Sequence, residues 1–144
     1  MQKDAPDHLE ADLILKLYDL RREPVMREAR DLLAREFWPK NTKEAVAVLQ
    51  LDHPLNRAYR QVSTYWEMVY RMARHGIIHG DFLVENNAEG MLLFARVEPY
   101  LAEIRTASSP RSFESAEWVA TEVPMGRTIA AHMRARVKKT LAGK

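Results

Sequence analysis

The stretch Pro54–His75, PLNRAYRQVSTYWEMVYRMARH, decides the fold, because its apolar residues recur with the period of an α-helix. At about 3.6 residues per turn, one broad stripe collects most of them: Leu55, Tyr59, Val62, Trp66, Val69, Tyr70 and Ala73. Tyr65, Met68 and Met72 form a second, narrower stripe. A helix with two apolar faces is either central to its own fold or shared with another chain. The segment therefore predicts a helix at the centre of the architecture.

The other periodicities along the chain are helical as well. Two apolar stripes flank Pro24, and a single helix through this proline would turn them in opposite directions. A break just before Pro24 brings both stripes onto one core, whereas a kinked single helix inside an oligomer is the less favoured alternative. Pro99 is expected to kink or divide a helix over residues 89–105, and a last helix is expected from about Met125 to Leu141.

Length and composition bound the fold class. The chain has 144 residues, 47% of them hydrophobic and 29% charged, which is typical of one soluble globular domain. It has five glycines, too few for an all-β fold, and no cysteine for disulfides or thiolate metal sites. We therefore predict an all-α, single-domain, irregular or orthogonal bundle of about six to eight helices.

The predicted organisation has three parts. Residues 1–8 are expected to be disordered, residues 9–121 to form the helical core, and residues 122–144 to form a basic C-terminal helix docked on that core. The predicted core residues are Leu13, Leu17, Leu20, Leu32, Leu33, Tyr59, Val62, Trp66, Val69, Phe94 and Leu101.

Charge is distributed unevenly along the chain. The last eighteen positions hold six of the 22 basic residues and no acidic one, which leaves sixteen basic against twenty acidic residues in 1–126. The candidates for binding an anion or nucleic acid are Arg127, Arg134, Arg136, Lys138 and Lys139. Such an amphipathic helix can lie on a phosphate backbone or on anionic lipid, but it can equally dock its apolar edge on the body. Docking is the favoured interpretation.

Motifs for chemistry are missing from the sequence. It has no glycine-rich phosphate loop, nucleophile elbow or two-histidine zinc motif. His75, His79, Asp81 and Glu85 are suitable metal ligands by type, but Gly76 is expected to end the helix between the two histidines. Asp81 is expected to cap the next helix. We therefore predict no catalytic residue, no metal site and no cofactor.

Glu67 is the carboxylate with the most suggestive neighbours on the central helix. The helical period places it in one sector with Arg60, Arg71 and Arg74. A pair between Glu67 and Arg71, four residues apart, contributes about 0.2–0.5 kcal/mol on a helix surface. This sector is predicted to be a solvated face.

The stripe of Tyr65, Met68 and Met72 is the candidate interface, because methionine and tyrosine are enriched where proteins meet. Its alternative is packing under the C-terminal helix. The leading functional hypothesis is a non-enzymatic protein that acts through protein–protein contact, as a homo-oligomer. Nucleic-acid binding through the basic helix, and an enzyme of a class that motifs do not reveal, are the alternatives. Without a secretory signal or a run of apolar residues long enough to span a membrane, a cytoplasmic protein is expected.

Three segments carry a resemblance to a known family: ADLILKLYDLRREPVMREAR (Ala11–Arg30), TYWEMVYRMARHGII (Thr64–Ile78) and LFARVEPYLAEIR (Leu93–Arg105). They resemble an uncharacterised all-helical family of bacterial proteins, over roughly residues 9–105. That family has no assigned function, so the resemblance implies an all-α bacterial cytoplasmic protein and assigns a role to no residue.

Overall fold

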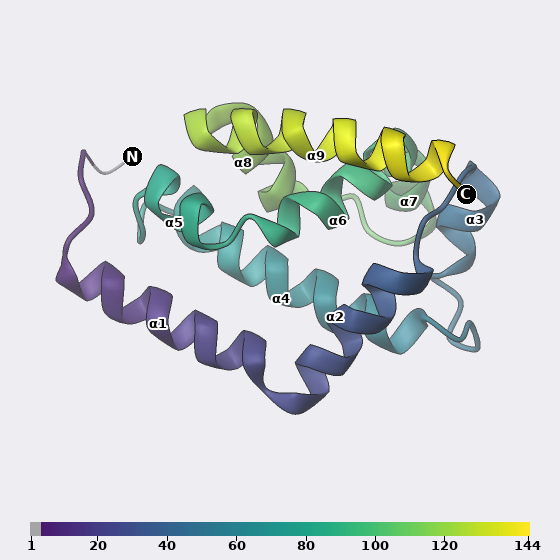
Figure 1. The fold of residues 1–144 in the computed structure, drawn as a ribbon, viewed down its shortest axis with the longest axis horizontal. Helices are drawn as coiled ribbons and strands as arrows, with labels where there is room; N and C mark the ends of the chain where they lie inside the picture. Colours follow the sequence, from purple (N-terminus) through teal and green to yellow (C-terminus); the bar gives the residue numbers. More distant parts are fainter. Residues whose placement is uncertain (1–3) are drawn as a thin grey trace.

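The computed structural model of the chain describes residues 4–144, and over these residues it holds helices and no strand. The helices are α1 (His8–Arg22), α2 (Pro24–Glu36), α3 (Thr42–Ala47), α4 (Asn56–Arg74), α5 (Gly80–Asn86), α6 (Glu89–Val97), α7 (Leu101–Ala107), α8 (Glu114–Glu122) and α9 (Pro124–Ala142), with the 3₁₀ turn η1 (Glu98–Tyr100) between α6 and α7 (Figure 1). The predicted all-α, single-domain bundle is confirmed. None of the helices in this part of the chain has the length and apolar character needed to cross a bilayer.

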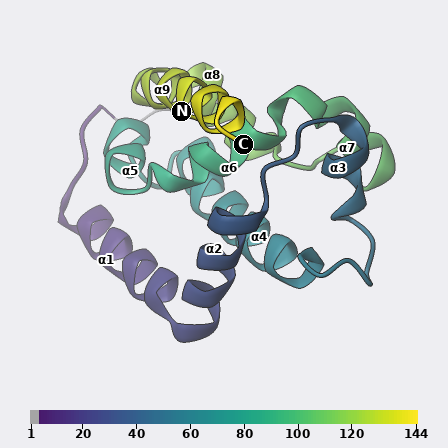
Figure 2. The same ribbon diagram turned by 45° about the vertical axis from the view of Figure 1, so that its right-hand side comes forward.

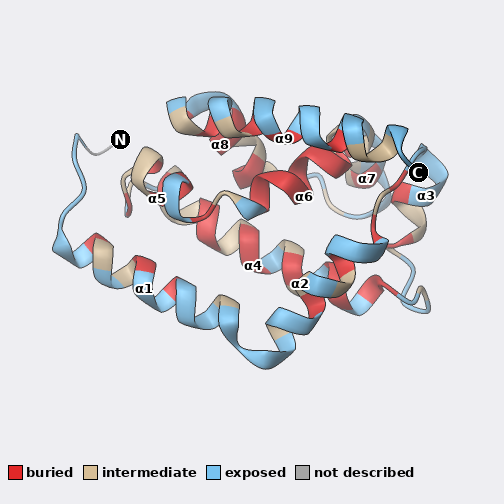
Figure 3. Cartoon of the chain, in the orientation of Figure 1, coloured by how far each residue is buried: buried red, intermediate tan, exposed pale blue. Residues whose placement is uncertain are grey.

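Helix α4 runs through the middle of the molecule, as its two apolar stripes predict. Two views agree that α9 lies on one side of the α4 and α6 layer and α1 on the opposite side (Figures 1 and 2). Helix α6 is buried along nearly its whole length, from Gly90 to Val97, so it forms the inner layer between α4 and α9 (Figure 3). The core therefore lies mainly among α4, α6, α8 and α9, and α1 is added to its outside.

The prolines divide the helices where the sequence predicts. α1 ends at Arg22 and α2 begins at Pro24, with the Glu23 side chain accepting the N–H of Met26 at 3.1 Å. Pro99 lies in the 3₁₀ turn that separates α6 from α7. Both predictions are confirmed, because proline lacks the N–H that an uninterrupted helix requires.

Most of the predicted core is buried, with one error and two half-buried residues. Leu13 and Leu32 are half-buried. The prediction that Leu20 belongs to the core is wrong, because its side chain is 53% exposed. In α1 only Glu10, Ile14 and Leu17 are buried. Leu20 lies on a different side of the helix from these three, and α1 touches the body along one narrow stripe only.

The N-terminal boundary also differs from the expectation. Residues 1–3 of the segment expected to be disordered lie outside the described residues. Asp7 and Glu10 form a reciprocal capping box, in which each side chain accepts the backbone N–H of the other. The first helix therefore begins inside the 1–8 segment.

Helix α9 is packed closely against the body. Ala130, Met133 and Val137 on its inner side are buried. At its first turn Gly126 faces α8 so closely that a Cβ on this glycine would lie 2.0 Å from the carbonyl oxygen of Val119. A side chain at position 126 would therefore force the two helices apart.

Candidate functional site

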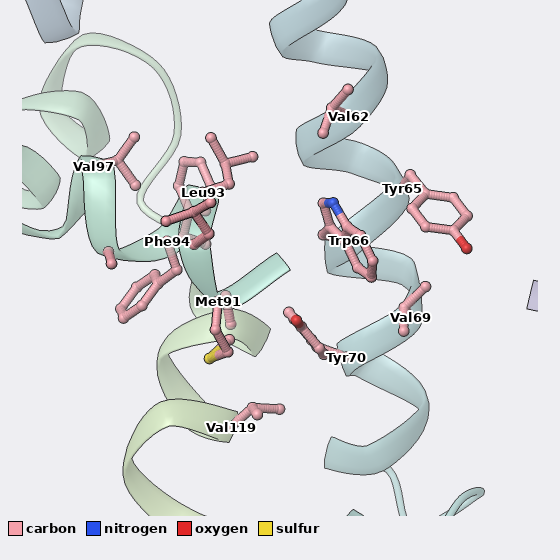
Figure 4. Packing of buried hydrophobic residues seen from close by; sticks show 14 of the residues in the cluster. Val62, Tyr65, Trp66, Val69, Tyr70, Met91, Leu93, Phe94, Val97 and Val119 are labelled. Atoms are coloured by element: carbon pink, nitrogen blue, oxygen red, sulfur yellow. The ribbon is translucent and has the colours of Figure 1, made fainter. Parts of the chain in front are cut away.

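The two apolar faces of α4 have different partners. Trp66 and Tyr70 point toward α6, whereas Tyr65 points to the other side (Figure 4). The Tyr65 side chain is 6% exposed, and its hydroxyl donates a hydrogen bond of 2.6 Å to the carbonyl oxygen of Leu17 in α1. Met68 and Met72 are half-buried against the core. The alternative that this stripe packs under the C-terminal helix is wrong for Tyr65, because α1 covers it. Contact of the stripe with another chain stays a prediction.

Polar side chains hold α1 on the body. The carboxylate of Glu10, 2% exposed, accepts the backbone N–H of His79 at the start of α5. Arg21 donates to the side-chain oxygen of Asn87 at 3.4 Å, and the guanidinium of Arg30 in α2 donates to the carbonyl oxygen of Arg21 at 3.1 Å. These bonds fix the position of α1 although few of its apolar side chains are buried.

The outer sides of α1 carry most of the exposed large apolar side chains. Among the described residues seven such side chains are exposed, and five of them lie between residues 9 and 25: Leu9 (63%), Leu15 (64%), Tyr18 (43%), Leu20 (53%) and Val25 (46%). Figure 3 shows α1 largely as exposed surface. We call these five residues, four on α1 and Val25 in the first turn of α2, the α1 surface. The sequence indicates such exposure, since α1 has apolar residues on more than one side and a single neighbouring layer can cover only one of them.

The prediction of a solvated face is wrong at Glu67, although Arg60 in the same sector is exposed. The Glu67 carboxylate accepts the backbone N–H groups of Ser115 at 3.0 Å and Ala116 at 2.8 Å, in the first turn of α8. Burial raises the pKa of Glu67, and the two amides and the charge of Arg71 counteract that rise. Glu67 thus acts as the N-terminal cap that α8 lacks in its own sequence.

A pocket of about 370 Å³ opens beside Glu67, between α4 and the segment 107–113. Its charged lining residues are Arg60, Arg71, Arg111 and Glu67. Its apolar lining includes Leu49, Tyr59 and Phe113, and serine and threonine hydroxyls stand around it. The pocket could not be predicted from the sequence, because Arg111 and Phe113 lie in a loop without a recognisable pattern.

The basic candidates on α9 fall into two groups. Arg134 makes a bidentate pair with Glu98, with nitrogen–oxygen distances of 2.7 and 2.9 Å, and Arg127 donates to the carbonyl oxygen of Thr121 at 3.1 Å. The side chains of the remaining three candidates make no hydrogen bond or ion pair within residues 4–144: Arg136, Lys138 and Lys139. All five are exposed.

Two of the residues with metal-ligand side chains, His79 and Asp81, accept backbone N–H groups at the starts of helices. His79, not Asp81, caps α5, because its Nδ1 accepts the N–H of Phe82 at 3.2 Å. Asp81 instead accepts the N–H of Met125 at 2.8 Å and so binds α5 to the start of α9. Over the part of the chain that the structure describes, no three histidine, aspartate or glutamate side chains converge as metal ligands would.

The chain matches a family model over most of its length. The family model described as a domain of unknown function, DUF4760, matches residues 7–123. The chain belongs to the DUF4760 family. The match runs from the N-cap of α1 to the last residue before α9, so it includes both the α1 surface and the pocket. The resemblance to a family without assigned function is confirmed. Neither the curated proteins nor the solved structures contain a match to the chain.

Proposed function

We propose that this DUF4760 protein is a non-enzymatic, cytoplasmic helical protein that acts through protein–protein contact, by pairing with a second copy of itself through α1. One observation carries the proposal: four of the seven exposed large apolar side chains within residues 4–144 lie on the single helix α1, and a fifth, Val25, lies in the first turn of α2. Exposed apolar side chains are unremarkable when scattered singly, but their concentration on one helix of fifteen residues favours an interaction site there.

The spacing of residues on α1 favours a second copy as the partner. Leu9, Leu13, Lys16 and Leu20 follow one edge of the helix at intervals of four, three and four residues. This spacing is the same in both directions, so two antiparallel α1 helices related by a twofold axis would set Leu9 opposite Leu20 and Leu13 opposite Lys16. A twofold interface requires the same surface on both partners, and the spacing of this edge satisfies that requirement.

The size of the α1 surface limits the strength of the pairing. It is confined largely to a single helix of fifteen residues. Stable interfaces bury about 800 Å² on each partner, and one edge of such a short helix supplies less. We therefore expect a weak dimer whose population rises with protein concentration.

Sedimentation velocity over a concentration series tests the proposal. The wild-type chain should shift toward the mass of a dimer as its concentration rises, and Leu20→Glu should remain monomeric. Leu51→Glu is the matched control, because Leu51 is 83% exposed but lies far along the chain from α1. It should dimerise like the wild type. A wild-type chain that is monomeric at every concentration would refute the proposal.

Nucleic-acid binding through α9 is the second candidate, supported by the unpaired and exposed side chains of Arg136, Lys138 and Lys139. Binding of this kind releases counterions, so its affinity should fall steeply with salt, with a log–log slope of about one per phosphate contacted. The double change Lys138→Gln and Lys139→Gln should lower that slope by about two. Binding that is insensitive to salt would eliminate this candidate.

A further inference from the structure

A buried polar atom without a hydrogen-bond partner lines the pocket between α4 and the segment 107–113. Within residues 4–144, three buried side-chain polar atoms have no hydrogen-bond partner: Arg71 Nε, Arg74 Nε and Ser115 Oγ. All three lie on the last turns of α4 or the first turn of α8, and Arg71 among them lines the pocket. Buried polar groups in folded proteins are nearly always paired, so the unpaired Nε of Arg71 indicates that a further molecule completes the site.

The guanidinium groups around the pocket have hydrogen-bond donors to spare. Arg60 uses its Nε for the side-chain oxygen of Asn56 at 3.0 Å, and Arg111 uses its Nε for Glu114 at 2.9 Å. The terminal nitrogens of these two side chains, and the whole guanidinium of Arg71, make no hydrogen bond with any other described residue. Arginine presents its N–H groups in a planar fork that fits the oxygens of a phosphate or carboxylate.

The charge of the pocket favours a dianion. Three arginines and one glutamate line it, which leaves a net charge of +2. Glu67 has committed both carboxylate oxygens to the amides of Ser115 and Ala116, so it is held at the end of α8. A phosphate monoester carries a charge of about −1.5 to −2 near pH 7, whereas a single carboxylate would leave one positive charge unbalanced.

The apolar side of the pocket has room for an organic group. Tyr59 and Phe113 meet edge to face there, with ring centroids 6.2 Å apart. Phe113 has a φ of 60°, in the left-handed region that a bulky side chain rarely adopts. Backbone strain of this kind persists where the surrounding structure imposes it, and it is concentrated at binding sites. Here it places the Phe113 ring in the pocket, two residues after Arg111.

We infer that this pocket binds a small organic phosphate monoester, with the phosphate among Arg60, Arg71 and Arg111 and the organic group against Tyr59 and Phe113. The site lies between α4 and the α7–α8 connection, so it is separate from the α1 surface. Loss of dimerisation would leave it intact, and loss of phosphate binding would leave the dimer intact.

Calorimetric titration of the full chain with phenyl phosphate tests the inference. Phenyl phosphate should bind more tightly than inorganic phosphate, which lacks the organic group, and than phenylacetate, which carries one charge less. Arg71→Gln should weaken phenyl phosphate binding by at least about tenfold, because it removes charge-assisted hydrogen bonds. Arg60→Gln should weaken it similarly, and it carries the test should Arg71→Gln fail to fold, since Arg60 is exposed.

Arg27→Gln is the matched control, because it removes the same charge from an exposed position of α2 outside the pocket. It should bind phenyl phosphate as the wild type does. The inference is overturned if the wild type binds none of the probes, or if the pocket variants and the control weaken binding equally. Equal or tighter binding of phenylacetate would contradict the preference for a dianion. A phosphoserine peptide that binds more tightly than phenyl phosphate would overturn the assignment of the pocket to a small organic phosphate.

Discussion

Helices α1 and α9 lie on opposite sides of the α4 and α6 layer, and they meet that layer in different ways (Figures 1 and 2). α9 packs through apolar side chains and a glycine that touches the backbone of α8. α1 buries two apolar side chains, Ile14 and Leu17, and is otherwise held by hydrogen bonds of polar groups. Both helices are amphipathic in sequence, yet α9 buries its apolar side and α1 leaves several apolar side chains exposed. An apolar side chain is therefore buried only where it faces the side of the helix that the body covers.

The comparison changes the expected role of α1 and not that of α9. The basic α9 was expected to dock on the body, and its inner side is buried, with two of its basic side chains engaged within the chain. α1 was expected to be part of the core, yet it exposes Leu9, Leu15 and Leu20. The apolar side chains left without a partner therefore lie on α1.

The largest difference between the two helices should appear when an apolar side chain is truncated. Met133→Ala on α9 should lower the free energy of unfolding by about 2–5 kcal/mol, because Met133 is only 8% exposed. Leu15→Ala on α1 should change it by less than about 0.5 kcal/mol, because Leu15 is 64% exposed. Urea denaturation of dilute protein measures both, and equal losses would contradict the difference in docking.

A single methyl group at the contact of α9 with α8 should have the next largest effect. Gly126→Ala should lower the free energy of unfolding by about 1–3 kcal/mol, because the carbonyl of Val119 is backbone and cannot move aside. Gly143→Ala is the control at the other end of α9, where the closest atom to an added Cβ is 3.7 Å away. Thermal unfolding should show a lower midpoint for Gly126→Ala alone.

Removal of the bond between α4 and α1 should have a smaller effect. Tyr65→Phe deletes the hydroxyl that donates to Leu17 and should lower the free energy of unfolding by about 0.5–1.5 kcal/mol. Tyr18→Phe is the control, because the Tyr18 side chain is 43% exposed and its hydroxyl donates no hydrogen bond within the described residues. If the two variants have the same stability, the bond contributes nothing to the attachment of α1.

The smallest effect concerns pH and Glu67. Burial raises the pKa of Glu67 in the folded protein above its ordinary value of 4.5, so the folded state binds more protons between these two pKa values. The contribution of Glu67 to the free energy of unfolding should therefore decrease as pH rises through that window and be constant above it. Glu67→Gln lacks this titration, so the difference between the two unfolding curves against pH isolates it. A difference that increases with pH would contradict the raised pKa.

Some of the structure could be predicted because its causes are local. The breaks at Pro24 and Pro99 follow from the missing N–H of proline, and the central position of α4 follows from its two apolar stripes. The exposure of Leu20 could not be predicted, because it depends on how α1 is rotated against the body. The burial of Glu67 depends on amides 48 and 49 residues farther along the chain, and the pocket depends on the same contact.

Hydrogen–deuterium exchange at low and high protein concentration tests most directly whether α1, and not α9, is the surface through which the chain pairs. A partner on α1 would shield its backbone and slow the opening of the helix, whereas α9 is already packed within the chain. We predict that amide exchange over residues 8–22 slows as the concentration rises, while exchange over residues 124–142 does not change. Exchange in α1 that is independent of concentration, or a slowing confined to α9, would contradict the account.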